Sequence, residues 1–283
     1  MTAAALPIAV PAIRRPFNPA HEFFRREPLL ASLGLLMAAL LLPTAFAMFV
    51  DQRTLAGVNV WVKPLKFEAS LALYTLTLAW LAAWLPAGTR ARPWYRTYIR
   101  LVAAAIVLEM AWLLYAAAIG QPSHFNRTDP VLALVYPVMG GMAVVLTSAT
   151  LVYGLQIRRN DALAVPPALK AAVVQGLVVT FVLTVLAAGF MSTGGSHLVG
   201  GNVSDVEALP VMGWARDGGD LRVAHFFATH AMHFIPAFGF AWAMVAGGKS
   251  TRPVNLFTVL FAAFTLFLIL QALDGRPFLP AIG

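Results

Sequence analysis

Three histidines lie on one apolar segment, Arg222 to Phe234, and form the clearest chemical pattern in this sequence. His230 and His233 are three residues apart, so on a helix they share a face and could bind one metal ion through neutral imidazoles. His225 and His230 are five residues apart, about 140° around a helix, which does not suit a single compact centre. We therefore expect other helices to supply further ligands.

Two acidic residues, Glu68 and Glu109, interrupt other apolar segments. At about 1.5 Å of rise per residue, Glu68 lies about 9 Å and Glu109 about 16 Å below the outer ends of their helices. The same arithmetic places His230 at about 12 Å and His233 at about 16 Å. Titratable groups inside a membrane are costly and usually face the interior of the bundle. Their similar depths predict one shared site in the outer half.

We expect these side chains to form two groups. The outer group consists of His225 with His197 and His124. The inner group pairs the two deeper histidines with a carboxylate, either Glu109 or Glu68. In the alternative interpretation, the histidines are packing residues that donate hydrogen bonds, and Glu68 pairs with Lys66 or Lys63. Glu109 has no basic neighbour in the sequence, so it must be neutral, paired with a histidine or bound to a cation.

The loop that contains Ser196 and His197 is rich in glycine. Adjacent side chains rarely point at each other, and the Gly-x-Ser-x-Gly motif of a serine nucleophile is missing from the sequence. We therefore expect this loop to fold back over the outer end of the bundle and present His197 to it. Asp220, just before the histidine segment, is expected to cap a helix N-terminus.

The composition identifies the solvent around these residues. Of 283 residues, 60% are hydrophobic and only 11% are charged, and the mean hydropathy is +0.76. A soluble domain carries about 25% charged residues, so the chain belongs in a bilayer. The net charge of +8 lies in short clusters between apolar runs, which indicates membrane topology and no nucleic-acid partner. The sequence has no cysteine, which excludes disulfides, thiol nucleophiles and iron–sulfur clusters.

Seven apolar stretches are long enough to cross the roughly 30 Å hydrocarbon core of a membrane. We predict an all-α bundle of seven transmembrane helices within residues 29–273, preceded by a basic and aromatic interfacial arm at 1–28. Residues 193–222 form the capping outer loop, and residues 274–283 form a short outer tail. The predicted spans are Leu29–Val50, Leu65–Leu85, Leu101–Ile119, Val131–Leu155, Ala171–Ser192, Val223–Ala246 and Val254–Leu273.

The basic residues predict the orientation. With these spans, 13 of the 20 lysines and arginines lie on the side of the N-terminus. The positive-inside rule therefore places the N-terminus in the cytoplasm and the C-terminus outside. We expect a bacterial inner (plasma) membrane protein whose site faces outwards. The cytoplasmic half offers few polar residues, which argues against a pathway through the bundle. The main candidates there are Thr147, Ser148, Thr150, Gln175 and Thr180.

Our first hypothesis is a membrane enzyme or redox protein that acts on a lipid-like or small apolar substrate or on a quinol. His230 and His233, with His225 or His197, would hold zinc, copper or iron, and Glu109 or Glu68 would act as general base. Haem b is an alternative cofactor, which would take its second axial ligand from His124, His197 or a methionine such as Met191.

Two other hypotheses remain open. The chain could be a proton- or ion-coupled transporter or sensor in which Glu109 and the histidines of the sixth span titrate. It could also be a structural subunit of a membrane complex, in which the buried polar residues serve packing. The number of helices is similar to that of the seven-helix zinc hydrolases of the ceramidase and adiponectin-receptor kind. Their paired histidines on the last helix have no counterpart here, so this similarity implies no activity.

Overall fold

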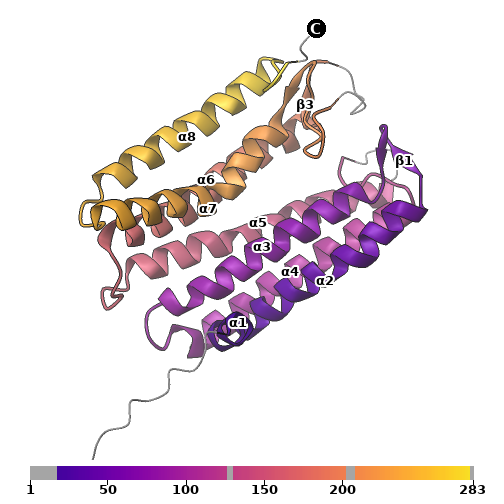
Figure 1. Ribbon diagram of the computed structural model, residues 1–283. Helices are drawn as coiled ribbons and strands as arrows, with labels where there is room; N and C mark the ends of the chain where they lie inside the picture. Colours follow the sequence, from indigo (N-terminus) through magenta and orange to yellow (C-terminus); the bar gives the residue numbers. More distant parts are fainter. Residues whose placement is uncertain (1–17, 126–129, 202–207, 281–283) are drawn as a thin grey trace, which may run out of the picture.

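The computed structural model describes residues 18–125, 130–201 and 208–280 as a bundle of antiparallel helices (Figure 1). A short helix, α1 (Pro19–Arg26), precedes seven long ones. The long helices are α2 (Pro28–Val50), α3 (Val62–Leu81), α4 (Pro93–Ala118), α5 (Pro130–Arg158), α6 (Pro167–Gly194), α7 (Leu221–Ala246) and α8 (Arg252–Leu273). Two short 3-10 helices, η1 (Ala82–Trp84) and η2 (Thr89–Ala91), join α3 to α4.

Six of the described helices are long and apolar enough to cross a membrane: α2, α3 with η1, α4, α5 from Leu134, α6 and α8. The helical membrane class predicted from composition is confirmed at this level. α7 has 26 residues but is not among the six. Its three histidines lower its mean hydropathy. These same histidines are the candidate functional residues. Seven spans and their orientation therefore stay predictions.

Local sequence explains where the helices begin and end. Proline stands in the first turn of α2, α4, α6 and α8, where its missing N–H has no intrahelical partner to lose. Left-handed glycines, Gly195 and Gly247, end α6 and α7. Asp220 caps α7, because its carboxylate accepts the backbone N–H of Arg222 at 2.9 Å. The expected cap at this helix is confirmed.

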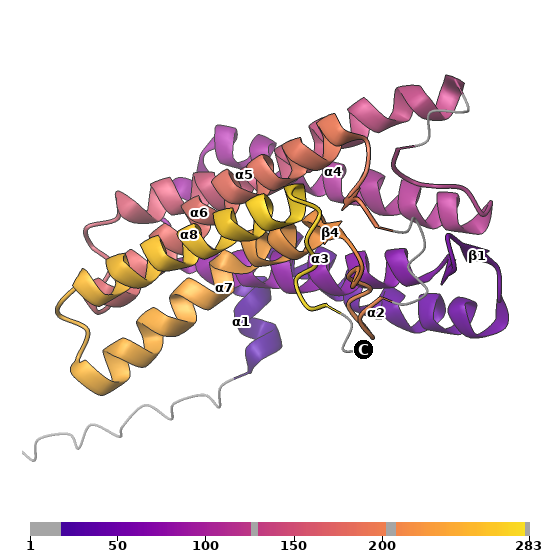
Figure 2. The same ribbon diagram turned by 90° about the horizontal axis from the view of Figure 1, so that it is seen from above.

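The long helices form two groups that lie side by side (Figure 1 and Figure 2). The first group, α2 to α5, lies around one large apolar core in which Leu30, Leu78 and Ile106 are fully buried. α6 and α7 also enter this core through Val173, Leu177 and Met232. The second group, α6 to α8, has two smaller cores, one near each end. α6 packs against both α5 and α7 and so joins the two groups.

Within the second group, α6 and α7 approach closely because small residues face each other. A Cβ atom added to Gly239 would lie 2.2 Å from the Cβ of Ala172. One added to Gly176 would lie 2.8 Å from the Cδ of Pro236. Small residues let helices pack tightly in a membrane, where lipid offers no hydrophobic drive for association. α6 and α7 are therefore a closely packed pair.

Two small hairpins close the end of the bundle that we predict to face outwards. β1 (Thr54–Leu55) pairs with β2 (Val58–Asn59) between α2 and α3. β3 (Leu198–Val199) pairs with β4 (Gly219–Asp220) between α6 and α7. The second hairpin brings the loop after α6 back onto the bundle, where Lys66 of α3 donates to the Met212 carbonyl at 2.9 Å.

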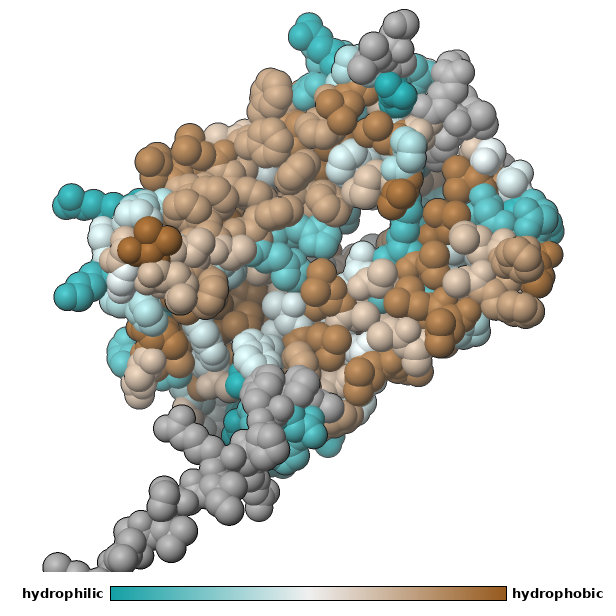
Figure 3. Space-filling view, viewed as in Figure 1, coloured by the Kyte–Doolittle hydropathy of each residue, from teal (hydrophilic) through white to brown (hydrophobic). Residues whose placement is uncertain are grey.

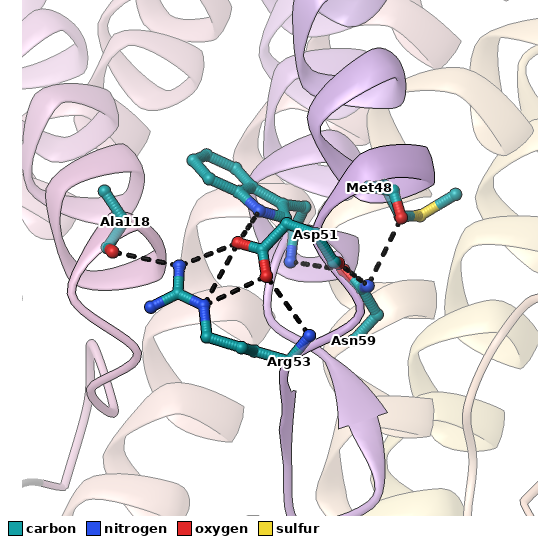
Figure 4. A network of polar contacts seen from close by, with 6 residues as sticks. Met48, Asp51, Arg53, Asn59 and Ala118 are labelled. Carbon is teal, nitrogen blue, oxygen red and sulfur yellow. Dashed lines mark hydrogen bonds and ion pairs between the residues drawn. The ribbon is translucent and has the colours of Figure 1, made fainter.

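A polar network around Asp51 fixes the first hairpin (Figure 4). The Asp51 carboxylate accepts from Arg53 at 2.7 Å and from the indole N–H of Trp61 at 2.8 Å. Arg53 also donates to the Ala118 carbonyl at the end of α4 at 3.0 Å. Hydrogen bonds from Arg53 and Trp61 lower the pKa of the Asp51 carboxyl below its ordinary value. The network ties α2, α3 and α4 into one rim.

The predicted spans coincide with α2 to α8 within a few residues, except at the start of α4. That helix begins at Pro93, eight residues before the predicted Leu101. The reason is that Arg96 and Arg100 interrupt the apolar run without interrupting the helix. These first turns carry charged side chains beyond the apolar stretch, so hydropathy marks the membrane crossing and not the end of the helix.

Candidate functional site

Three side chains join α7 to α3 in a line. His230 Nδ1 lies 3.3 Å from His233 Nδ1, one turn further along α7. His233 Nε2 lies 3.1 Å from the hydroxyl of Thr77 on α3. The Thr77 hydroxyl in turn donates to the Leu73 carbonyl at 2.7 Å. The two helix groups are therefore linked by hydrogen-bonding imidazoles and a hydroxyl.

The partners in this line assign the hydrogen positions. Thr77 has one hydroxyl hydrogen, which goes to the Leu73 carbonyl, so the oxygen accepts from the Nε2–H of His233. A neutral His233 then has a bare Nδ1, which accepts from the Nδ1–H of His230. The remaining nitrogen of His230, Nε2, is left as the unprotonated end. The line has one direction, from His230 to Leu73.

A second polar group lies nearer the hairpin end, where Lys63 of α3 is the central residue. Its ammonium donates to His124 Nδ1 at 3.0 Å, and the hydroxyl of Ser123 lies 3.1 Å from the same nitrogen. Lys63 is also close enough to Glu109 of α4 for electrostatic attraction. His124 interacts electrostatically with His225 of α7. The group thus gathers side chains from α3, α4, α7 and the loop after α4.

Two atoms of this group have no hydrogen-bond partner within the described ranges. Glu109 Oε1 and His225 Nδ1 are both buried and unpaired there. An unpaired buried polar atom costs about 1–3 kcal/mol, so proteins retain few of them without a purpose. Both belong to residues that the sequence marks as functional candidates. Either atom could form a hydrogen bond with a water molecule or a ligand, or bind a proton.

His124 lies outside the helices, and its protonation is set by its surroundings. Burial, followed by the nearby Lys63 ammonium and His225, lowers the pKa of His124 to about 3. His124 is therefore neutral at pH 7, which agrees with its role as acceptor from Lys63. Phe67 and Tyr136 pack around its ring, with centroids 6.5 and 6.1 Å away.

The loop between α6 and α7 borders the same region. Arg222, at the start of α7, forms an ion pair with the buried Asp220 at 2.7 Å and donates to the Gly213 carbonyl at 2.6 Å. The His197 carbonyl accepts from the N–H of Leu221 at 2.9 Å, so His197 lies where the hairpin meets α7. Hydrophilic side chains border the hollow between the two helix groups (Figure 3).

Glu68 is oriented differently from the other candidates. It is fully buried and accepts a hydrogen bond from the Thr44 hydroxyl of α2 at 2.6 Å. The alternative of a clamp with Lys66 or Lys63 is wrong, because these lysines contact the Met212 carbonyl and His124 respectively. The structure brings Glu109 to Lys63, and it places Glu68 against α2.

The described residues contain no group of three or more His, Asp or Glu side chains arranged to hold a metal ion. The histidines fall instead into two places: His230 and His233 form a pair, and His225 lies near His124. The expected grouping of the pair with a carboxylate is not among these contacts. Each place supplies fewer ligands than a metal centre built only from protein side chains requires.

No family model, curated protein or solved structure matches this chain. The function must therefore be argued from the side chains themselves.

A third polar group lies at the arginine-rich end, and the sequence reasoning identified only Ser148 among its members. The Tyr95 hydroxyl donates to Glu27 at 2.7 Å and lies 2.6 Å from the Tyr153 hydroxyl. Tyr98 and Ser148 are 2.7 Å apart. Tyr74 is close enough to Tyr98 and Tyr153 for electrostatic interaction. The expectation that this half of the bundle offers few polar residues is therefore wrong.

The signal for this group was present in the sequence. Four tyrosines occur inside or at the edge of apolar spans, where a buried hydroxyl requires a partner. Glu27 immediately precedes Pro28, at the start of an apolar span, where a carboxylate requires a partner. The hydroxyls escaped attention because tyrosine counts as hydrophobic in a composition.

Proposed function

We propose that this chain is a proton-translocating membrane protein, which is the transporter class of our sequence hypotheses. The observation that carries the proposal is the directed line His230–His233–Thr77 between the two helix groups. Histidine is the side chain whose ordinary pKa lies nearest to neutral pH, and it is a common proton shuttle. The unpaired Oε1 of Glu109 and Nδ1 of His225 near the hairpin end support uptake there.

The relay moves one proton by exchanging hydrogens within existing hydrogen bonds. A proton that binds His230 Nε2 makes an imidazolium, which passes its Nδ1–H to His233 Nδ1. His233 then releases its Nε2–H to the Thr77 oxygen, while the Thr77 hydroxyl turns away from the Leu73 carbonyl and gives its own hydrogen to a water molecule between the helix groups. Each residue ends with the number of protons it began with. The rings must then rotate to restore the original tautomers before the next transfer.

The tyrosine group continues the proposed route toward the arginine-rich end. No hydrogen bond among the described residues joins Thr77 to this group, so the proposal requires water between them. The Tyr153 hydroxyl lies 2.6 Å from that of Tyr95, which donates to Glu27 at 2.7 Å. Glu27 is an acceptor at the last step, next to the basic loops. Polar groups thus lie at both ends of the bundle, as a proton pathway requires.

The membrane placement is part of the same proposal. We propose α7 as a seventh span, because it is as long as its neighbours and packs along α6. The positive-inside rule supports an N-terminus in the cytoplasm. Glu109, His124 and His225 would then face the outer side of a bacterial inner membrane. Glu27 would face the cytoplasm.

The test is proton flux in liposomes that contain the purified full-length chain. A potassium gradient with valinomycin drives protons inward, and an enclosed pH-sensitive dye reports the internal pH. We expect flux well above that of empty liposomes. His233→Gln keeps hydrogen-bonding atoms but cannot carry a charge, so the flux should fall at least about tenfold.

The matched control is His21→Gln, which makes the same change on the exposed face of α1. It should leave the flux within twofold of the wild type. Flux equal to that of empty liposomes would overturn the proposal. An unchanged flux in His233→Gln would overturn the route through α7.

A metal-dependent enzyme is the second candidate, and one distance favours it. The Nδ1 atoms of His230 and His233 are 3.3 Å apart. Two nitrogens bound to one tetrahedral zinc ion at about 2.0–2.1 Å would be about 3.4 Å apart. The remaining ligands would be water or substrate, and a lipid-like molecule, a small apolar molecule or a quinol would reach the ion from the bilayer. Haem b would require an axial ligand on another element.

Elemental analysis of the purified chain for zinc, copper and iron decides between the two candidates. One metal ion per chain, lost in His230→Ala/His233→Ala while the protein stays folded, would establish the metal enzyme. Iron would call for a haem spectrum. A value near zero in protein never exposed to a chelator would exclude this candidate and leave the proton relay.

A further inference from the structure

The arginine-rich end of the bundle contains a cavity of about 250 Å³ that the proton relay does not explain. It lies where α1, the start of α2, η2 and the first turns of α4 meet. Four arginines line it: Arg26, Arg90, Arg96 and Arg100. The one acidic residue of the lining, Glu27, is buried and accepts from Tyr95. The cavity therefore has a strong positive charge.

Two of the arginines are held in place by the fold. Arg26 lies over the Trp80 ring, with its guanidinium carbon 3.6 Å from the centroid, donates to the Trp80 carbonyl at 3.0 Å and forms an ion pair with Glu22 at 3.2 Å. Arg90 donates to the backbone carbonyls of Arg25 and Arg26. These contacts fix the wall of the cavity formed by α1 and η2.

The other two arginines are available to a ligand. Arg96 and Arg100 are four residues apart, on one face of α4, and both are exposed. Within residues 18–125, 130–201 and 208–280, neither guanidinium has a hydrogen bond or ion pair. A guanidinium binds a phosphate group through two parallel N–H donors. Two such groups one turn apart suit one phosphate.

The apolar residues of the lining indicate what the phosphate is attached to. Leu29 and Ile99 lie in the cavity beside the arginines. α1 lies across the ends of the long helices, as Figure 1 and Figure 2 show together. Its Phe23 packs on Trp80 with centroids 5.6 Å apart, while Phe24 and Trp94 remain 42% and 41% exposed. Exposed aromatic residues at this level are typical of a membrane interface.

We propose that this cavity binds the phosphate of an anionic phospholipid. The headgroup enters between Arg96, Arg100 and the fixed Arg26 and Arg90. The acyl chains lie along the apolar sides of α2 and α4. Basic pockets beside transmembrane helices are a known means of recognising anionic headgroups. The apolar floor and the neighbouring aromatic residues favour a lipid over free phosphate.

The test uses the full-length chain in detergent, with bound lipid counted by native mass spectrometry. The probes are dioleoylphosphatidylglycerol, dioleoylphosphatidylcholine and inorganic phosphate. We expect the anionic lipid to bind at least about tenfold more tightly than the zwitterionic one. Arg96→Gln/Arg100→Gln should lower the affinity for the anionic lipid about 30-fold, because each arginine contributes about fivefold.

The matched control is Arg158→Gln/Arg159→Gln, which removes the same charge from exposed residues at the end of α5, outside the cavity. It should change the affinity by less than about threefold if the site is specific. Both pairs are exposed, so thermal melting should show folded protein in each case. Equal affinity for the two lipids, equal losses in the two double variants, or phosphate binding as tight as the anionic lipid would each overturn the proposal.

Discussion

α7 contacts two of its neighbours, α6 and α3, by opposite means. Toward α6 it presents Gly239 and Ala231, and not even a methyl group fits at Gly239 without a shift of the neighbouring helix. Toward α3 it presents His233, whose contact is a hydrogen bond to Thr77. One interface is packed through small residues, and the other is joined through polar atoms.

This difference indicates which surface can change and which cannot. Close packing of small residues loses its dispersion contacts when the helices separate, so α6 and α7 should move together. A polar contact can exchange one partner for water at little net cost. Proton movement requires rings that rotate and hydrogens that exchange. The polar interface between the two helix groups provides that freedom, and the α6–α7 interface keeps the rings in place.

The largest effect should come from breaking the packed interface. Gly239→Leu would place a Cβ atom 2.2 Å from that of Ala172 and the rest of the side chain beyond it. Overpacking of this kind costs about 1–3 kcal/mol or more, so we expect little folded protein. Gly189→Leu on α6 is the matched control, since no atom lies within 4 Å of its Cβ position. Similar yields and melting temperatures for the two variants would contradict the comparison.

The sequence predicts the helices better than it predicts their contacts. Hydropathy finds each long helix because the length of an apolar run reflects the thickness of the bilayer. It also singles out His225, His230 and His233, because histidine is rare in such a run. Which helices face each other depends on side-chain packing between segments far apart in the chain. Nothing in the sequence distinguishes Thr77, because its role depends on the contact with His233 of α7.

The contacts of charged residues at the helix ends were harder to predict than the helices themselves. Lys63 looked like a membrane-edge residue, yet it joins His124 and Glu109 in one group. His124 reaches Lys63 because of the conformation of the loop after α4. Hydrophobic periodicity predicts helices and strands, and it does not predict the conformation of such a loop. The tyrosine group was missed for another reason, since an aromatic ring satisfies the hydropathy of a span while its hydroxyl still requires a partner.

The second largest effect concerns the pH dependence of stability from His124, in the polar group around Lys63. His124 has an ordinary pKa of 6.5 and a folded-state pKa of about 3. The unfolded chain therefore binds the proton more readily, and folding stability is complete above pH 6.5 and falls toward pH 3. The loss at pH 5 is about 2 kcal/mol. Thermal melting between pH 7.5 and 5 should show it.

His124→Gln should remove this part of the pH dependence. The groups that surround the ring are Lys63 of α3, Ser123 of the same loop and His225 of α7. His225→Gln is therefore measured beside it, to separate the two imidazoles. An unchanged slope of stability against pH in His124→Gln would show that other groups cause the loss.

A smaller effect is expected from Thr77→Val, which removes the acceptor of His233 and keeps the side-chain shape. The lost hydrogen bond is worth about 1 kcal/mol of stability. Proton flux should fall much more than stability, because the relay loses its link between the two groups. Thr147→Val is the control, since Thr147 also bonds the carbonyl four residues back and contacts no histidine in the described structure. Equal flux in the two variants would exclude Thr77 from the route.

The smallest effect should come from Asp51→Asn at the rim of the first group. Arg53 and Trp61 favour the charged carboxylate, so its pKa lies below the ordinary 3.8. Its contribution to stability is therefore present above pH 3.8 and is lost as the pH falls below that value. At pH 7 the variant should melt slightly lower than the wild type, and at pH 3 the difference should shrink. Because the pair is partly exposed, solvent screening keeps its effect small. A flux change as large as that of Thr77→Val would mean that the rim takes part in the polar interface, and the two regions would no longer be separable.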